Sequence, residues 1–252
     1  MSSTAGLMKI EIDGDRVDAA TLWSTTSGFG HFTAMQVRAR RTRGLSLHLR
    51  RLEAANRELF GAELDRERVR ELVRHALGDV QDASVRVYFF ESDGAPSVMV
   101  TVKEPGGVAG PQRLQSVRYQ RPDAHLKHLA TGQGYYGRLA RRNGFDDALL
   151  TSADGTVSET AIANIGFFDG SGIVWPDAPL LHGITMQLLE QTLPSRRARV
   201  RVQDFAAFSG AFVANARGIA AVSHVDDVSL PVQAGRMEVV DEAYAAVPRD
   251  AI

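Results

Sequence analysis

The sequence predicts an α+β protein with mixed sheets, divided into two domains. Segments that alternate between apolar and polar residues recur along the chain and are typical of strands, and segments with apolar residues at helical spacing separate them. A stretch dense in glycine and proline, Glu104-Pro-Gly-Gly-Val-Ala-Gly-Pro111, interrupts this pattern and indicates a linker. We therefore expect a small α/β domain at residues 1–105, a linker at 106–111 and a larger domain at 112–252.

The first domain is predicted to contain strands around two helices. Asp65 is expected to cap the second helix, because its carboxylate can accept an N–H from the first turn. Asp13-Gly14 follows the first strand and is a tight-turn signal. The expected strands are residues 8–12, 31–40, 84–91 and 97–103, and the expected helices are 47–60 and the segment from Asp65 to Gly78.

The second domain is predicted to mix short strands with helices. Glycine-containing turns at Asp154-Gly155 and at 170–172 separate the strands, and Gly183 precedes a helix. The expected elements are strands at 114–120 and 198–202, helices at 131–143 and 237–246, and the helix that follows Gly183.

Composition narrows the function classes. The 252 residues carry a net charge of -1, so no global attraction to nucleic acid or to an anionic membrane is expected. No cysteine is present, which removes disulfides, thiolate metal sites and cysteine nucleophiles. The N-terminal segment lacks the features of a signal peptide, and no apolar run is long enough to span a membrane. The sequence predicts a cytoplasmic protein.

The scarcity of lysine draws attention to three positions. Only Lys9, Lys103 and Lys127 are lysines among 29 basic residues. A lysine that persists in an arginine-rich chain is a candidate for chemistry that arginine cannot perform, such as forming a Schiff base through a neutral amine. The alternative, that all three persist by chance, stays open on this observation alone.

Two histidines flank one of these lysines. His125 and His128 are three residues apart, but no carboxylate lies at a matching interval, so we expect no metal site. Cationic neighbours favour the free amine of Lys127, which is the form that a Schiff-base lysine needs.

The residues that follow this lysine resemble a known family. Residues 126–168, LKHLATGQGYYGRLARRNGFDDALLTSADGTVSETAIANIGFF, are similar to the fold-type IV (class IV) pyridoxal-phosphate enzymes, which include aminotransferases and aminodeoxychorismate lyase. Three further segments resemble the same family in the same order, so the resemblance extends over about residues 30–225. They are HLRRL at 48–52, LHGIT at 181–185 and FVANARG at 212–218.

The resemblance implies a role for each matching residue. Lys127 would hold pyridoxal 5′-phosphate as a Schiff base and shuttle the Cα proton of the substrate. Glu159 would keep the pyridine nitrogen protonated, which makes the ring a better electron sink. The remaining cofactor contacts would be phosphate ligands at Arg51, Ile184 and Thr185, a loop-holding residue at Asn164, and a segment at Asn215 and Ala216 that closes over the phosphate.

The resemblance also implies a substrate pocket and a cleft between the two domains for the cofactor. The segment around Gly30 would line the pocket. Arg86 interrupts an apolar strand and would form a buried ion pair or bind a substrate carboxylate. Tyr135 would line the pocket or pack in the core. The candidates for the pocket are His31, Phe32, Thr33, Arg86 and Tyr135.

The expected function is that of a transaminase moving an amino group between a small amine or amino acid and a 2-oxo acid, in a homodimer. Aminodeoxychorismate lyase is the alternative, because Asn215-Ala216 stands where many aminotransferases carry hydroxyl residues. Met186, where the family usually has arginine, and Ala130 are further departures that affect the substrate rather than the cofactor. A degenerate homologue that only binds is a third hypothesis, which the joint presence of the cofactor residues opposes.

Overall fold

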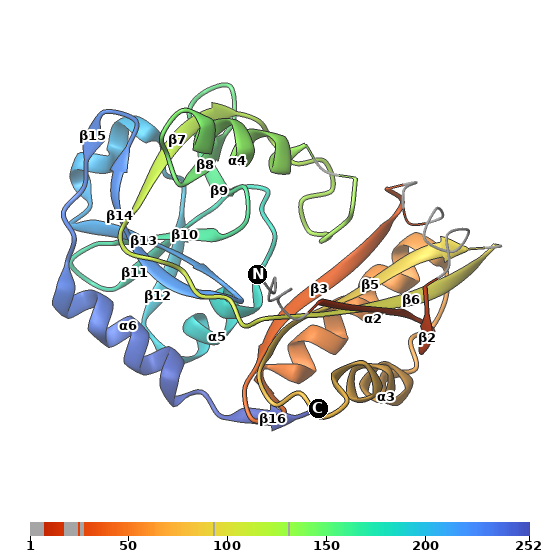
Figure 1. Cartoon of the computed structure of the whole chain (residues 1–252). Coiled ribbons are helices and arrows are strands. Elements are labelled where there is room, and N and C mark those ends of the chain that lie inside the picture. Colours follow the sequence, from red (N-terminus) through yellow and green to blue (C-terminus); the bar gives the residue numbers. More distant parts are fainter. Residues whose placement is uncertain (1–7, 18–24, 26–27, 93, 131) are drawn as a thin grey trace, which may run out of the picture. The chain divides into compact units, whose positions relative to one another are not determined.

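The computed structural model describes residues 8–17, 25, 28–92, 94–130 and 132–252, and the α+β class with mixed sheets is confirmed. The chain divides into two compact units (Figure 1). The first contains Met1–Gly106, Leu126–Ala130 and Pro248–Ile252, and the second contains Gly107–His125 and Thr131–Val247.

An antiparallel sheet forms the centre of the first unit, with strand order β2-β1-β6-β5-β3. Asp13 and Gly14 both have positive φ, as a tight hairpin turn between β1 and β2 requires. The strands are β1 (Met8–Ile12), β2 (Asp15–Arg16), β3 (Gly30–Val37), β5 (Ala83–Ser92) and β6 (Ala95–Lys103).

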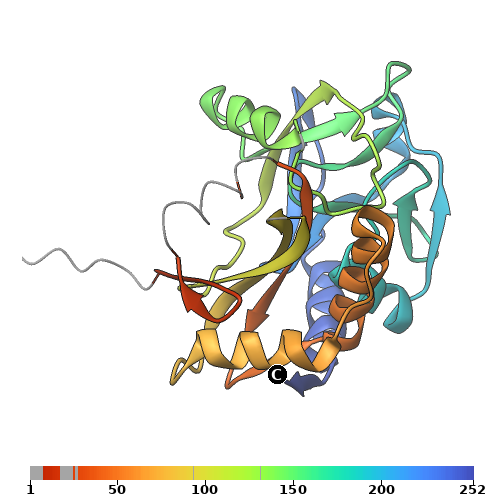
Figure 2. The same ribbon diagram turned by 90° about the vertical axis from the view of Figure 1, so that its right-hand side faces the viewer.

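Two helices pack on one side of this sheet, α2 (Leu45–Phe60) and α3 (Arg66–Leu77). Asp65 caps α3 as expected, since its carboxylate accepts the backbone N–H of Arg68 at 2.9 Å. The apolar side chains of both helices share one core with those of β3, β5 and β6. Figure 2 shows the two helices crossing steeply.

Two segments that the sequence assigned to the larger domain belong to the first unit. The backbone around Lys127 extends the edge of the sheet, because Phe32 N–H donates to Lys127 O and Leu129 N–H donates to Gly30 O, both at 2.9 Å. Near the end of the chain, β16 (Arg249–Ala251) pairs with β4 (Arg41–Arg43). The division into compact units therefore differs from the expected domain of 112–252 at these two places, because long-range strand pairing cannot be deduced from local composition.

A mixed sheet with strand order β12-β11-β10-β13-β14-β7-β8-β9 organises the second unit. The neighbours β11–β12, β14–β7 and β7–β8 are parallel, and the other pairs along this order are antiparallel. The strands are β7 (Gln112–Arg118), β8 (Asp147–Thr151), β9 (Val157–Thr160), β10 (Asn164–Phe168), β11 (Ile173–Pro176), β12 (Ser195–Ala198), β13 (Gly210–Asn215), β14 (Gly218–Val225) and β15 (Val228–Ser229), which pairs with β14.

Three helices pack against this sheet. The first, α4 (Gln133–Arg142), shares a small core with β8, while α5 (Ile184–Thr192) and α6 (Ala234–Ala246) share another with β10, β11 and β13. None of the helices in the described ranges is both long enough and apolar enough to cross a membrane.

The strand expected at 198–202 is wrong. The strand β12 ends at Ala198, and a 3-10 helix covers Val202–Ala207. Val200 O accepts the N–H of Val157 at 2.8 Å, and the carboxylate of Asp204 accepts the N–H of Arg201 at 3.0 Å, which starts the turn. Arginine alternates with valine in this segment, which fits a strand as well as it fits the observed structure. The sequence pattern could not distinguish a strand from a loop followed by a 3-10 helix.

The side chain of His31 predicts a pH dependence of stability. It is fully buried and stacks on Phe89 with ring centroids 5.1 Å apart, and burial lowers its pKa to about 4. Because the unfolded state takes up the proton first as the pH falls below about 6.5, stability is present above that pH and is lost toward pH 4. His31→Phe keeps a ring in the stack and removes the titration.

We expect the free energy of unfolding of the wild type to fall by about 2 kcal/mol more than that of His31→Phe between neutral pH and pH 5. Urea unfolding at several pH values measures this difference. Parallel pH profiles for the two proteins would contradict the argument.

Candidate functional site

Lys127 lies beside β3 in the first unit. The hydrogen bond from Phe32 N–H to its carbonyl fixes the backbone of the lysine against the edge strand. Its Nζ is 4.8 Å from the centroid of the Phe32 ring, within the range of a cation–π contact. The amine is therefore held over an aromatic surface by a sheet-like attachment of its own backbone.

Arg51 belongs to the same region of the first unit. It lies on α2, as does His48, which is buried and whose Nδ1 is 2.6 Å from the Thr33 hydroxyl. Burial lowers the pKa of His48 to about 3, and the positive charges of Arg51 and Lys127 lower it further. The structure thus brings Arg51 and Lys127 within electrostatic reach of one neutral imidazole.

The face of the sheet opposite the helices carries a different set of side chains. Phe32, Arg86 and Tyr88 lie on this face: the Arg86 guanidinium carbon is 5.9 Å from the centroid of the Phe32 ring, and its Nη1 donates to the Tyr88 hydroxyl at 3.1 Å. His31 and Thr33 alternate to the helix-covered face and are fully buried. Both were expected to line the substrate pocket, and the structure places their side chains against the helices instead of on the face that carries Phe32 and Arg86.

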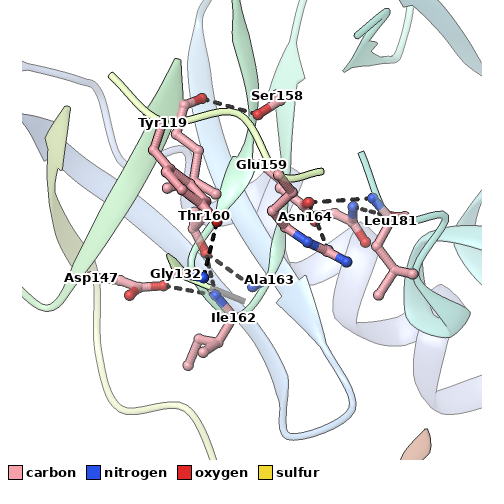
Figure 3. A network of polar contacts seen from close by, with 12 residues as sticks. Tyr119, Gly132, Asp147, Ser158, Glu159, Thr160, Ile162, Ala163, Asn164 and Leu181 are labelled. Atoms are coloured by element: carbon pink, nitrogen blue, oxygen red, sulfur yellow. Dashed lines mark hydrogen bonds and ion pairs between the residues drawn. The ribbon is translucent and has the colours of Figure 1, made fainter. Parts of the chain in front are cut away.

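Glu159 is a buried carboxylate in the second unit. It lies on β9 with 6% of its side chain exposed, and its Oε1 accepts from Arg121 Nη1 at 2.9 Å. The backbone N–H of Leu181 donates to the same oxygen at 3.3 Å, as Figure 3 shows. Both donors stabilise the charged form of the carboxylate.

Two side-chain oxygens, from Thr160 and Asp147, accept backbone N–H groups of the turn that joins Glu159 to Asn164. Thr160 Oγ1 accepts the N–H of Ala163 at 3.0 Å, and Asp147 Oδ2 accepts the N–H of Ile162 at 3.3 Å (Figure 3). Burial raises the pKa of Asp147. These bonds fix β9 and β10 relative to each other, and with them the two site residues that the strands carry.

Asn164 ties this turn to the start of α5. Its side-chain amide donates to Leu181 O at 2.8 Å, and Leu181 is also the residue whose N–H donates to Glu159. A Cβ at Gly183 would overlap Asn164 Oδ1, so the close approach of the Asn164 side chain requires glycine at position 183. The loop-holding role that the resemblance implies for Asn164 stays a prediction, and the bond recorded here joins Asn164 to the segment before α5.

Replacing Gly183 with alanine is expected to destabilise the second unit by roughly 1–3 kcal/mol, because the added methyl must displace Asn164. Gly170→Ala is the matched control in the same unit, since a Cβ there meets nothing within 4 Å. Chemical unfolding of the two variants measures the difference. Equal stability would show that the segment relaxes without cost.

The start of α5 offers backbone N–H groups. Gly183 is the N-cap of α5 and makes no side-chain capping bond, and Ile184 and Thr185 begin the helix with buried side chains. A helix N-terminus attracts anions through these N–H groups and the helix dipole. The Thr185 hydroxyl donates to Asn215 O at 2.8 Å, so in this structure its proton is directed to β13.

The remaining candidates from the sequence are Asn215, Ala216 and Tyr135. Asn215 ends β13 and braces the turn to β14, since its amide donates to Ile162 O at 3.3 Å and its oxygen accepts Arg217 N–H at 2.7 Å. Ala216 follows it in this turn. Tyr135 is 66% exposed on α4, which removes the alternative that it packs in the core.

Two residues of the site were not found from the sequence. Arg121 follows β7 with 4% of its side chain exposed, and nothing in its neighbourhood distinguishes it from the many other arginines. His48 was seen only as part of a motif, although its bond to Thr33 joins α2 to β3. Only tertiary contacts reveal either residue, because their partners are distant in sequence.

The chain matches one family model. Residues 30–225 match the model described as amino-transferase class IV, and this range contains Arg51, Lys127, Glu159 and Thr185. Among curated protein sequences, none matches this chain.

Solved structures with the same fold include three of direct interest. A hypothetical aminotransferase from Mycobacterium tuberculosis in its PLP-bound form has 21% identity and a TM-score of 0.81, with 95% of this chain and 98% of that chain covered. A branched-chain aminotransferase from Thermoproteus uzoniensis with norvaline has 21% identity and a TM-score of 0.79, with 95% and 94% covered. A putative 4-amino-4-deoxychorismate lyase from Legionella pneumophila has 20% identity and a TM-score of 0.75, with 87% and 92% covered.

Proposed function

This chain belongs to the class IV amino-transferase family, and we propose that it is a transaminase that moves an amino group between a small amine or amino acid and a 2-oxo acid. The family depends on pyridoxal 5′-phosphate, which is the cofactor. The observation that supports the proposal best is the presence, within the matched range, of an amine held over an aromatic ring and a buried, ion-paired carboxylate.

The residues present fit this cofactor. The start of α5 presents backbone N–H groups, which suit a phosphate, and Arg51 adds a cation. Lys127 is an amine able to link to an aldehyde, and Glu159 is a carboxylate able to hold a proton on a ring nitrogen.

When bound, pyridoxal phosphate supplies an electron sink for the charge that develops at the substrate Cα. Lys127 Nζ would hold the cofactor covalently and, once displaced by the substrate amine, take the Cα proton and return it. Arg51, Thr185 and the amides of α5 would bind the phosphate. In this proposal Thr185 contributes mainly through its backbone N–H, because its hydroxyl donates to Asn215.

Arg86 is proposed to bind the substrate carboxylate. It shares the face opposite the helices with Phe32, the ring under the Lys127 amine. A guanidinium recognises a carboxylate through paired hydrogen bonds, and lysine does not reproduce this geometry. Phe32 and Tyr135 are proposed to line the same pocket.

The alternative is an aminodeoxychorismate lyase, which Asn215-Ala216 at the end of β13 favours. The lyase would release 4-aminobenzoate and pyruvate and would use the same lysine and glutamate. We further propose a homodimer in the cytoplasm, which light scattering and cell fractionation test.

Half-reaction spectra test the proposal. The purified holoenzyme is mixed with a panel of amino donors, and the absorbance of the cofactor is followed before and after addition of 2-oxo acids. A transaminase converts the cofactor to its amine form and regains the original spectrum with a 2-oxo acid. Production of 4-aminobenzoate from aminodeoxychorismate supports the lyase instead. If neither change occurs, a protein that only binds the cofactor becomes the favoured hypothesis.

A further inference from the structure

Arg121 and Glu159 form a buried ion pair next to the start of α5. Their side chains are 4% and 6% exposed, and Nη1 and Oε1 are 2.9 Å apart. By contrast, Arg57 and Glu63 form a pair at the same distance whose side chains are 59% and 77% exposed. The chain therefore offers two Arg–Glu pairs with the same shortest N–O distance that differ in burial.

Taking both charges of a pair out of water is costly, and packing alone gives no reason to keep them. The guanidinium cannot lose its proton at any pH that the protein survives, so its positive charge is permanent. It therefore favours the ionised form of Glu159, as does the N–H of Leu181 on the same oxygen.

The ion pair influences which of two atoms carries a single proton, the carboxylate of Glu159 or the ring nitrogen of the cofactor. A carboxylate next to a pyridinium holds the same number of protons as a carboxylic acid next to a neutral pyridine, and the two arrangements differ only in which atom carries the proton. Burial by itself favours the neutral arrangement, because it disfavours both charges. A fixed cation beside the carboxylate reverses this preference.

We propose that Arg121 is a positioning residue that keeps this shared proton on the pyridine nitrogen of the cofactor rather than on Glu159. The inference rests on the proposed function, because it requires Glu159 to face that nitrogen. Through its contact with Glu159, Arg121 would determine how strongly the cofactor ring withdraws electrons.

Nitrogen NMR of the holoenzyme loaded with pyridoxal phosphate labelled with ¹⁵N in the ring tests the proposal. The resonance of a pyridine nitrogen moves far upfield when it is protonated, so it reports the position of the proton without any turnover. We expect the protonated resonance in the wild type, and a shift toward the neutral position in Arg121→Met, which removes the charge at similar volume. Arg57→Met removes the exposed matched pair and should leave the resonance unchanged.

A lysine variant keeps the test decisive if Arg121→Met does not fold. Lysine can lose its proton at alkaline pH, whereas arginine cannot. The resonance in Arg121→Lys should therefore shift toward the neutral position as the pH is raised to about 10, a transition that the wild type lacks.

The outcomes separate the two levels of the argument. A wild-type resonance in Arg121→Met, or the lack of an alkaline transition in Arg121→Lys, would overturn the role of Arg121 and leave the proposed function intact. An unchanged resonance in Glu159→Gln would instead show that Glu159 does not face the ring nitrogen, which would remove that part of the proposed function.

Discussion

Replacing Lys127 with alanine is expected to lower kcat/KM by about 10⁴-fold or more, since both the covalent attachment of the cofactor and the proton transfer at Cα are lost. Lys127→Arg should do no better, because a guanidinium provides no neutral amine. The fold should persist, since the contact of Nζ with Phe32 is worth about 1 kcal/mol. Steady-state kinetics and chemical unfolding measure the two effects.

Lys103→Ala is the matched control, because this lysine lies exposed at the end of β6 in the same unit. It should retain wild-type turnover. Borohydride reduction followed by peptide mapping identifies the lysine that carries the cofactor. A reduced adduct on Lys9 or Lys103 would show that the assignment of Lys127 is wrong.

Glu159→Gln is expected to lower kcat by about 10²–10³-fold, because the glutamine has no charge with which to hold the proton on the ring nitrogen. Cα proton abstraction should become strongly rate-limiting, so deuterated substrate should give a large primary isotope effect. Turnover close to that of the wild type would contradict the role of Glu159 as the partner of the ring nitrogen.

The ion pair adds a second effect of the same substitution. Removing one charge of a buried pair typically costs about 3 kcal/mol or more, so Glu159→Gln should also destabilise the protein before any substrate is added. Glu63→Gln, in the exposed pair with Arg57, should leave stability almost unchanged. The double variant Arg121→Met with Glu159→Gln should regain stability but not activity, which separates the structural effect from the chemical one.

Local elements were predictable because their signals are local. The strand at Met8–Ile12 and the cap at Asp65 depend on residues within a few positions of each other, and both are confirmed. The strand at 198–202 was wrong because alternation of apolar and polar residues does not specify a partner strand, and the partner of β11 is Ser195–Ala198.

The candidate site was predicted from motifs, and the predicted roles await the experiments above. The resemblance selected Lys127, Glu159 and Thr185 one by one, but it could not say which side chains surround them. Alternation along β3 directs Phe32 to one face and His31 to the other, a consequence of strand geometry that became visible only when the strand boundaries and the helix-covered face were known.

The sequence by itself determined the α+β class, the family and the cofactor, because these depend on periodicity and on motifs that are continuous in the chain. Only the tertiary structure decided that Lys127 is attached to the edge strand of the first unit, and that Arg121 is buried against Glu159. Both depend on contacts between segments far apart in the sequence. The hydrogen bonds and the burial that make these contacts favourable exist only after the chain has folded, so no local pattern of residues encodes them.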